Sequence, residues 1–313
     1  MIIYGPVPSR RLGQSLGINN IPPKICTYSC AYCQIGRTKK MQLDRMDYYE
    51  GDRILKDIRT RVEQVRKNDQ KIDYLSFVPD GEPTLDINLG QEIEMLGQLG
   101  IKTAVITNSS LLWREDVRKD LMNADWVSVK VDSVREEAWR KINRPHRKLR
   151  LDSILEGILD FSKVYKGELT TETMLVKGLN DEEEHLEEIA RYLSSVNPSK
   201  SYLAIPIRPP AENYIQSPSE EVINRSFQIF IEYLNHVEYL IGYEGNAFAF
   251  TGNVEEDILS ITAVHPMRED AVRNFLDRSN AGWEIIQNLV ADGKLIEISY
   301  TGKNFYLRKF SKK

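Results

Sequence analysis

Cysteine and histidine are scarce in this 313-residue sequence, which contains three of the former and four of the latter. All three cysteines lie between Cys26 and Cys33, too close together for a disulfide framework that closes long loops. An odd number of clustered cysteines indicates a reducing compartment and a metal site. None of the histidines is spaced near the cysteines as in a zinc knuckle.

The sequence also lacks any apolar run long enough to cross a bilayer, and the Met1–Arg11 stretch has no apolar segment of the signal-peptide type. We therefore expect a soluble, cytoplasmic protein without a membrane partner. The net charge is −4, so the chain as a whole does not attract phosphate backbones, although a local basic patch remains compatible with it. Its 41% hydrophobic residues are enough for one large core and a smaller appendage.

Between about Arg53 and Leu234, short β-branched runs alternate with longer amphipathic stretches, as in βαβ units with a parallel sheet. Six strands are expected, at Ser15–Asn19, Ile72–Val78, Ile101–Thr107, Trp126–Val131, Leu169–Val176 and Tyr202–Ile207. Five helices are expected, at Ile54–Arg66, Leu112–Met122, Leu151–Val164, Glu182–Leu193 and Glu220–Leu234. We predict an α/β fold, a partial (β/α)6 barrel over residues 1–250, with functional residues at the carboxyl ends of its strands.

After Asn253 the pattern changes to three short helical segments followed by two strands joined at Thr301–Gly302. This order resembles a small winged-helix domain, assigned to residues 251–313, and the linker is expected within Gly242–Gly252. A winged helix commonly reads nucleic acid with its third helix. The corresponding segment, Gly282–Asp292, contains two acidic residues and no Lys or Arg. We therefore expect this domain to dock a protein, cap the substrate or act structurally.

The cysteines follow the spacing CxxxCxxC, as Cys26-Thr-Tyr-Ser-Cys30-Ala-Tyr32-Cys33. Three thiolates on one loop can each bind a different iron of a cubane cluster, which leaves the fourth iron without a protein ligand. S-adenosylmethionine (SAM) carries an amino group and a carboxylate on one carbon and can chelate that iron. The alternative is a structural zinc site, which needs a fourth ligand that no further cysteine can supply.

The run Gly5–Gly13, the cysteine loop and Gln34–Arg37 resemble the radical SAM family related to the wyosine synthetases of transfer RNA. The resemblance continues through Asp80–Thr84, Thr107–Ser109, Asn143–His146 and Leu175–Gly178. It implies a radical SAM barrel with a [4Fe-4S] cluster on Cys26, Cys30 and Cys33, reduced by an external flavodoxin- or ferredoxin-like protein. It also implies cleavage of SAM to a 5′-deoxyadenosyl radical that abstracts hydrogen from a substrate. That substrate, a small molecule, a protein or tRNA, is not identified by the sequence.

The turn after the Ile72–Val78 strand contains Gly81 and Glu82 and resembles the Gly-Gly-Glu turn with which superfamily members grip the methionine amino group. Asp80 replaces the first glycine. The alternative is an ordinary turn, since Asp, Gly and Pro all favour turns. Tyr32 would lie near adenine by the same resemblance, or pack as a plain aromatic side chain.

Two further strand ends contribute candidates for the SAM site. Asn108 and Ser109 follow one strand and either bind ribose hydroxyls or cap the next helix. Lys130 and Asp132 share one face of the following strand by alternation. They resemble the Lys and Asp pattern of glycyl-radical activating enzymes, in which the lysine contacts the methionine carboxylate and the acid contacts ribose. The alternative is a structural ion pair.

The substrate candidates are Arg10, Arg144, His146 and Arg208. Three other functions remain open besides a radical SAM enzyme with an unidentified substrate. One is a tRNA-modifying enzyme like the wyosine synthetases, although those carry a second cluster on cysteines that this chain lacks. Another is an iron–sulfur sensor that binds DNA through its winged helix and does not cleave SAM. A glycyl-radical activating enzyme is a third option, weakened by the extra C-terminal domain.

Overall fold

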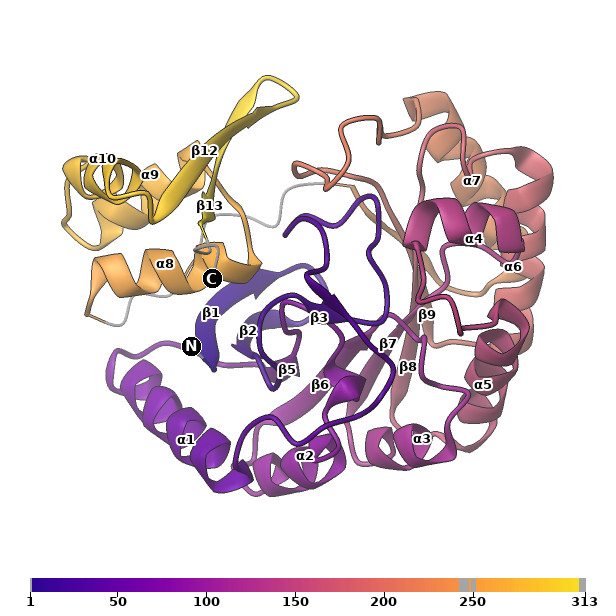
Figure 1. Ribbon diagram of the computed structural model, residues 1–313, viewed down its shortest axis with the longest axis horizontal. Helices are drawn as coiled ribbons and strands as arrows, with labels where there is room; N and C mark the ends of the chain where they lie inside the picture. Colours follow the sequence, from indigo (N-terminus) through magenta and orange to yellow (C-terminus); the bar gives the residue numbers. More distant parts are fainter. Residues whose placement is uncertain (1, 242–247, 249–251, 310–313) are drawn as a thin grey trace.

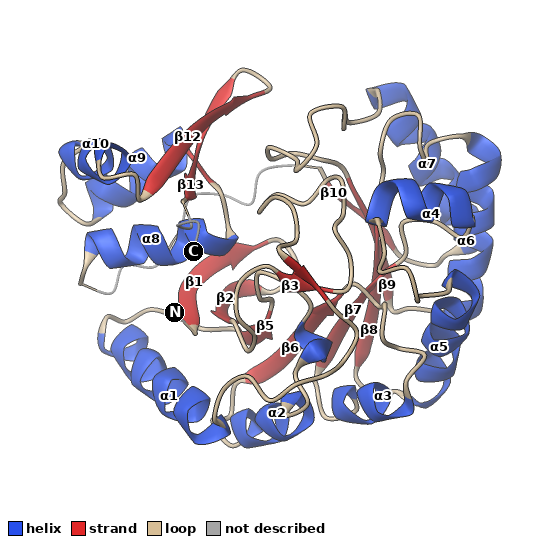
Figure 2. Ribbon diagram, in the orientation of Figure 1, coloured by secondary structure: helices blue, strands red, loops and turns tan. Residues whose placement is uncertain are grey.

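A computed structural model of the protein describes residues 2–241, 248 and 252–309 (Figure 1). Its main feature is one curved eight-stranded sheet in the order β1-β2-β5-β6-β7-β8-β9-β10. The strands from β2 to β10 pair in parallel, and β1 pairs with β2 in the antiparallel direction. The predicted α/β class is confirmed as a curled half-barrel, with the helices on its outer face (Figures 1 and 2). Among the described residues, no helix is long and apolar enough to span a bilayer.

The strands of the sheet are β1 (Ile3–Ser9), β2 (Gly13–Ile18), β5 (Tyr74–Phe77), β6 (Lys102–Thr107), β7 (Trp126–Lys130), β8 (Glu168–Met174), β9 (Lys200–Ala204) and β10 (Val237–Leu240). The surrounding helices are α1 (Gly51–Lys67), η1 (Pro83–Leu85), α2 (Leu89–Gly97), α3 (Glu115–Leu121), α4 (Glu136–Asn143), α5 (Leu151–Val164), α6 (Glu183–Val196) and α7 (Glu220–Tyr233).

The six expected strands correspond to β2 and β5 to β9, but the prediction of six misses both ends of the sheet. The sequence of β1 contains Gly5, Pro6 and Pro8, which argue against a strand in the middle of a sheet. Proline is tolerated there because β1 is an edge strand with one unpaired side. The other edge strand, β10, has only four residues, too few for a recognisable alternation. Helices α2 and α4 were not expected either.

The core of the barrel lies between the sheet and the helices, and α1 shows why the sequence folds this way. Ile54, Ile58, Val62 and Val65 recur at three- and four-residue spacing and form its buried face. They belong to the same apolar cluster as Phe77 of β5, which is completely buried. Each fully buried side chain of this size contributes about 1.5–3 kcal/mol, so the barrel has the large core expected from composition.

The C-terminal unit contains α8 (Val254–Val264), β11 (Met267–Arg268), α9 (Glu269–Arg278), α10 (Glu284–Ala291), β12 (Leu295–Tyr300) and β13 (Lys303–Arg308). Its strands form an antiparallel sheet in the order β11-β13-β12. The three helices and two of the strands match the expected segments. The short strand β11 was not expected. Most of the predicted linker, Gly242–Gly252, lies outside the described residues.

This unit packs against the first strand of the barrel (Figure 1). Tyr4 and Val7 of β1 belong to the same apolar cluster as Phe275 and the other core residues of the C-terminal unit. A 2.9 Å ion pair between Arg61 of α1 and Asp257 of α8 joins the two parts as well. Strand β1 therefore has the barrel sheet on one side and the C-terminal core on the other.

Candidate functional site

The cysteine loop begins where β3 (Ile25–Cys26) pairs in parallel with β4 (Lys40–Met41). Backbone hydrogen bonds hold it against two other segments. The amides of Ser29 and Ala31 donate to the carbonyls of Asn143 and Ile142, over 3.1 and 2.8 Å, at the end of α4. The amide of Glu212, in the loop after β9, donates to the carbonyl of Ala31 over 3.1 Å. The loop is therefore fixed by the fold and does not depend on its side chains alone.

Two asparagine side chains point their amides at cysteine sulfurs. Nδ2 of Asn108 lies 3.4 Å from Sγ of Cys26, and Nδ2 of Asn143 lies 3.6 Å from Sγ of Cys30. Burial raises the pKa of all three thiols, that of Cys30 to about 12. The thiolate is the form that binds metal. Hydrogen bonds from the two asparagine amides and the positive charge of bound metal both favour the thiolate against the effect of burial.

A mononuclear zinc site needs a fourth ligand besides the three thiols. Within the part of the chain that the structure describes, no three His, Cys, Asp or Glu side chains are arranged to hold a single metal ion. The donor set of three thiols on one anchored loop, with amide donors to two of the sulfurs, fits a [4Fe-4S] cluster with one open iron.

The turn after β5 is docked directly onto the segment that enters the cysteine loop. Gly81 forms a parallel bridge with Ile25, and a Cβ added to Gly81 would lie only 1.9 Å from the Ile25 carbonyl oxygen. Only glycine therefore fits there. The backbone amide of Lys24 donates to the carbonyl of Asp80 over 2.7 Å. Asp80, which stands in place of the first glycine of the Gly-Gly-Glu turn, therefore also contacts the segment that enters the cysteine loop. The predicted turn and the cysteines are thus parts of one structure.

The carboxylate of Glu82 is completely engaged within the fold. One oxygen accepts from the hydroxyls of Thr84 and Thr107, each over 2.6 Å, and the other accepts from the backbone N–H of Asn108 over 2.7 Å. Although burial raises the pKa of Glu82, these donors oppose that effect. Glu82 connects the ends of β5 and β6, so it positions Asn108 below Cys26.

Ser109 is also used by the scaffold. It has a positive φ of 69° and is completely buried. Its hydroxyl accepts from the amide of Lys130 over 2.8 Å and donates to the carbonyl of the same residue over 3.0 Å. The sequence predicted a ribose contact or a helix cap for this residue. The observed contacts fix the end of β7 instead.

Lys130 and Asp132 both lie at the site, but they do not form the pair that alternation indicated. Nζ of Lys130 lies 2.6 Å from Oε1 of Glu172 on β8 and 5.0 Å from the centre of the Tyr32 ring. The other oxygen of Glu172 binds Arg11. Burial by itself would raise the pKa of Glu172, but the charges of Lys130 and Arg11 lower it to about 2.

Asp132 is the centre of a separate network. Its Oδ2 accepts from the Tyr32 hydroxyl and, over 2.6 Å, from Nδ2 of Asn143, the amide that also faces Cys30. Its Oδ1 accepts from the amide of Met174 over 2.9 Å. Asp132 therefore orients Tyr32 on one side and the Asn143 amide on the other.

A cavity of about 260 Å³ opens beside this network, lined by Tyr32, Cys33, Lys130 and Glu172. Two of the predicted substrate residues, Arg10 and Arg208, line it as well. Arg208 is buried, donates to Oε1 of Gln34 over 2.6 Å, and lies 3.0 Å from Nε2 of His265 in the C-terminal unit. Arg208 therefore connects the wall of the cavity to the C-terminal unit.

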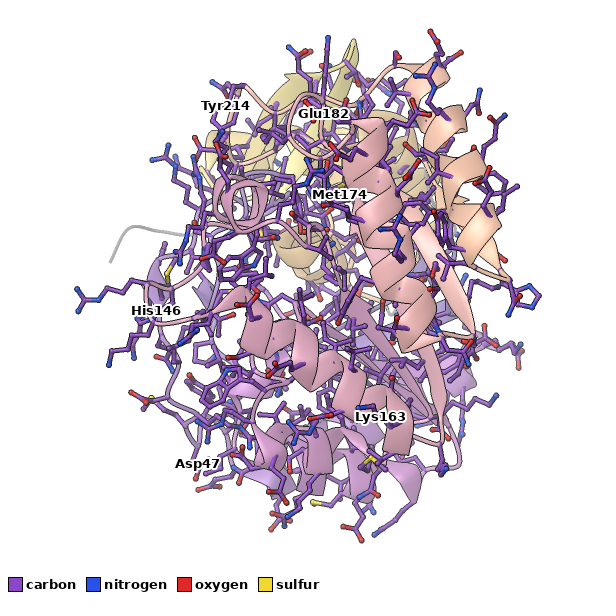
Figure 3. The ribbon with its side chains drawn as sticks, turned by 90° about the vertical axis from the view of Figure 1, so that its right-hand side faces the viewer. Asp47, His146, Lys163, Met174, Glu182 and Tyr214 are labelled. Carbon is purple, nitrogen blue, oxygen red and sulfur yellow. The ribbon has the colours of Figure 1, made fainter. Side chains whose placement is uncertain are left out.

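The other two predicted substrate residues do not line this cavity. Arg144 ends α4 in the left-handed conformation and binds Glu212, which Arg37 holds from the other side over 2.7 and 2.9 Å. His146 lies at the edge of the molecule in Figure 3, on the same side as Tyr214, whereas Met174 lines the cavity. The amide of His146 donates to the carbonyl of Thr27 over 2.9 Å. Both residues thus belong to the outer support of the cysteine loop.

Sequence reasoning missed three groups at this site. Glu172 carries the one charge in the interior of the Thr-rich strand β8, which is a usable signal. Glu212 gives no such signal, because it lies in a loop far along the chain from Arg37 and Arg144. Lys24, which contacts the buried Asp80 at 3.4 Å, was not singled out either.

Comparison with known proteins agrees with this geometry. The family model described as the radical SAM superfamily matches residues 20–193. A UPF0026 protein of Methanocaldococcus jannaschii is 53% identical over 309 residues, covering 98% of this chain and 96% of that protein.

Two solved structures share the fold at low sequence identity. A radical SAM methyltransferase from Sphaerobacter thermophilus is 15% identical, with a TM-score of 0.56 over 72% of this chain and 66% of that one. The structure of TYW1 with a lysine–pyruvate adduct bound is 18% identical, with a TM-score of 0.52 over 70% of this chain and 74% of that one. The family-model match, which covers more than half of the chain, shows that the chain belongs to the radical SAM superfamily, whose members use a [4Fe-4S] cluster and SAM.

Proposed function

We propose that the protein is a radical SAM enzyme that cleaves SAM reductively and uses the resulting radical to abstract hydrogen from a substrate. The observation that carries the proposal is the anchored loop of Cys26, Cys30 and Cys33, with side-chain amides of Asn108 and Asn143 directed at two of the sulfurs. When bound there, the cluster supplies the electron that splits SAM into methionine and a 5′-deoxyadenosyl radical. Hydrogen bonds to the sulfurs are a known means of tuning such a cluster.

The residues around the loop divide the task of holding SAM. Because no Cβ fits between Gly81 and the Ile25 carbonyl, the turn lies against the segment that enters the cysteine loop, where a backbone carbonyl can accept a hydrogen bond from the methionine amino group. Lys130 offers an ammonium for the methionine carboxylate, and its half-buried side chain lies beside the Tyr32 ring. Asp132 and Asn108 are the remaining polar side chains for ribose, and Tyr32 offers a ring face for adenine.

The neighbouring cavity of about 260 Å³ is the natural place for the substrate, because Tyr32, Cys33 and Lys130 line it together with Arg10 and Arg208. A carbon radical must be kept from solvent, which favours a site within the barrel. The electron comes from an external flavodoxin- or ferredoxin-like protein, and the three thiols favour a reducing cytoplasm.

We also propose that the C-terminal unit is a winged-helix domain that caps the substrate cavity. The order α8, β11, α9, α10, β12, β13 with a three-stranded antiparallel sheet supports the assignment. The hydroxyl of Tyr300 in β12 donates to the carbonyl of Pro206 over 3.1 Å, and Pro206 lines the cavity. With no basic residue in α10, this unit is better suited to capping than to reading nucleic acid.

The test is anaerobic reconstitution with iron and sulfide, followed by dithionite and SAM. Wild-type protein is expected to bind about four irons per chain and to form 5′-deoxyadenosine and methionine in equal amounts. The matched control is Cys30→Ser, which removes one iron ligand and is expected to abolish both the cluster signal and the product. A wild-type protein with a complete cluster that forms no 5′-deoxyadenosine would refute radical initiation.

A further inference from the structure

Lys24 and Asp80 form a buried ion pair beneath the cysteine loop. Nζ of Lys24 lies 3.4 Å from Oδ1 of Asp80, and the two side chains are only 8% and 4% exposed. Lys24 comes two residues before Cys26, and Asp80 directly precedes Gly81. The pair therefore joins the segment that enters the cysteine loop to the turn after β5.

Both charges keep unused hydrogen-bonding capacity. Nζ of Lys24 and Oδ2 of Asp80 are buried, and neither has a hydrogen-bond partner among the residues that the structure describes. Lys24 also adopts a positive φ of 65°, a conformation that costs a non-glycine residue about 1–3 kcal/mol. Because each buried ion also carries a desolvation penalty of several kcal/mol, the pair is poor at stabilising the fold by itself. Because the pair lies directly beneath the cysteine loop, we expect the two charges to act on a third charged group bound at that loop.

The ammonium of Lys24 lies beside the turn that follows Cys33. A Cβ added to Gly36 would lie 3.8 Å from Nζ, and the Gly36 amide donates to the Cys33 carbonyl over 3.0 Å. Asp80 directly precedes Gly81, which forms a bridge with Ile25 next to Cys26. The two opposite charges therefore lie beside the cysteine loop, one against the turn that follows Cys33 and the other beside the segment that leads to Cys26.

We propose that the Lys24–Asp80 pair sets the reduction potential of the cluster bound at Cys33, with Lys24 favouring the reduced state and Asp80 limiting that effect. Reduction adds one negative charge, so a fixed cation nearby raises the potential and a fixed anion lowers it, most strongly where water is excluded. The pair also gives a physical reason for an aspartate in place of the first glycine of the turn. Without Asp80, Lys24 would be a buried cation with no partner.

The inference rests on the proposed function, because it requires a cluster, but its measurement does not depend on turnover. The midpoint potential of the reconstituted protein is measured without SAM by electron paramagnetic resonance during a redox titration. Lys24→Met is expected to shift the potential to more negative values and Asp80→Asn to less negative values. The double variant is expected to return toward wild type. Lys40→Met, an exposed lysine of β4, is the control that leaves the potential unchanged.

The signs separate this role from a structural one. A change that only loosened the loop would move both single variants in the same direction, and that outcome overturns the inference, as do potentials equal to wild type. Should Lys24→Met fail to assemble a cluster, Asp80→Asn alone decides, because a less negative potential supports the pair and an unchanged or more negative one refutes it. Failure of the wild type to bind a cluster would instead refute the proposed function.

Discussion

Lys130 and Glu172 stand opposite each other on the neighbouring parallel strands β7 and β8, and their side chains form a 2.6 Å ion pair. Arg11, which precedes β2, binds the other oxygen of the same carboxylate. One buried anion therefore holds two cations in place beside the cavity. This arrangement fixes the direction of Lys130, which would otherwise have several rotamers available in an open barrel.

Replacing Glu172 with Gln is expected to destabilise the protein by about 3 kcal/mol, the lower end for a buried ion pair, because two half-buried cations lose their shared partner. The free energy of unfolding, measured in urea on the metal-free protein, checks this value. Glu238→Gln is the matched control, since Glu238 pairs with Lys200 at an exposed edge and such pairs contribute about 0–1 kcal/mol. Equal losses in the two variants would contradict the role assigned to Glu172.

The same carboxylate predicts an acid transition. The pKa of Glu172 is lowered from 4.5 to about 2 in the folded protein, so its contribution to stability is present above pH 4.5 and is lost as the pH falls toward 2. The shift corresponds to about 3 kcal/mol. The difference in unfolding free energy between wild type and Glu172→Gln should shrink over that pH range. A difference that stays constant would show that the charge of Glu172 does not stabilise the fold.

Gly81→Ala is expected to impair cluster binding, because the new Cβ would lie 1.9 Å from the Ile25 carbonyl oxygen and must displace the segment that leads to Cys26. Iron content after anaerobic reconstitution is the measurement. Gly97→Ala, at the end of α2 with nothing within 4 Å of its added Cβ, is the control. It should bind iron normally and gain about 0.5–1 kcal/mol in stability. Full iron loading in Gly81→Ala would show that the turn can move freely.

Glu212 joins Arg37, just after the cysteines, to Arg144 at the end of α4. Hydrogen bonds from Arg37 and Arg144 lower the pKa of Glu212 to about 2, so this contact is ionic at neutral pH. Glu212→Gln is expected to increase the rate at which a chelator removes iron by several-fold. Glu221→Gln, which breaks an exposed pair within α7, serves as the control. Identical rates would mean that the backbone bonds alone hold the loop.

The C-terminal unit should loosen before the barrel does. Phe275 is 1% exposed in its separate apolar cluster, and Phe275→Ala is expected to cost about 3–5 kcal/mol. Hydrogen exchange should then become faster in α8 to α10 while β5 to β8 keep their protection. Equal acceleration in both parts would show that the two cores unfold as one unit.

Much of the fold could be predicted because its signals are local. The central strands are short apolar runs between amphipathic helices, and the parallel sheet follows from that alternation. The edge strand β1 could not be recognised, because its glycine and prolines are compatible with pairing only at the edge of the sheet. The packing of β1 against the C-terminal core depends on contacts between residues that are more than 200 positions apart in the sequence.

The sequence by itself determined the chemistry of the site, because three cysteines on one loop define the ligand set and no other cysteine exists. Only the tertiary structure decided which side chains surround that loop. Alternation along one strand indicated that Lys130 would face Asp132, yet the nearest anion to Lys130 lies on the next strand. Likewise, Lys24 and Asp80 meet because the turn after β5 packs under the cysteine loop. Contacts of this kind depend on how distant segments close around each other, and spacing within one segment does not encode them.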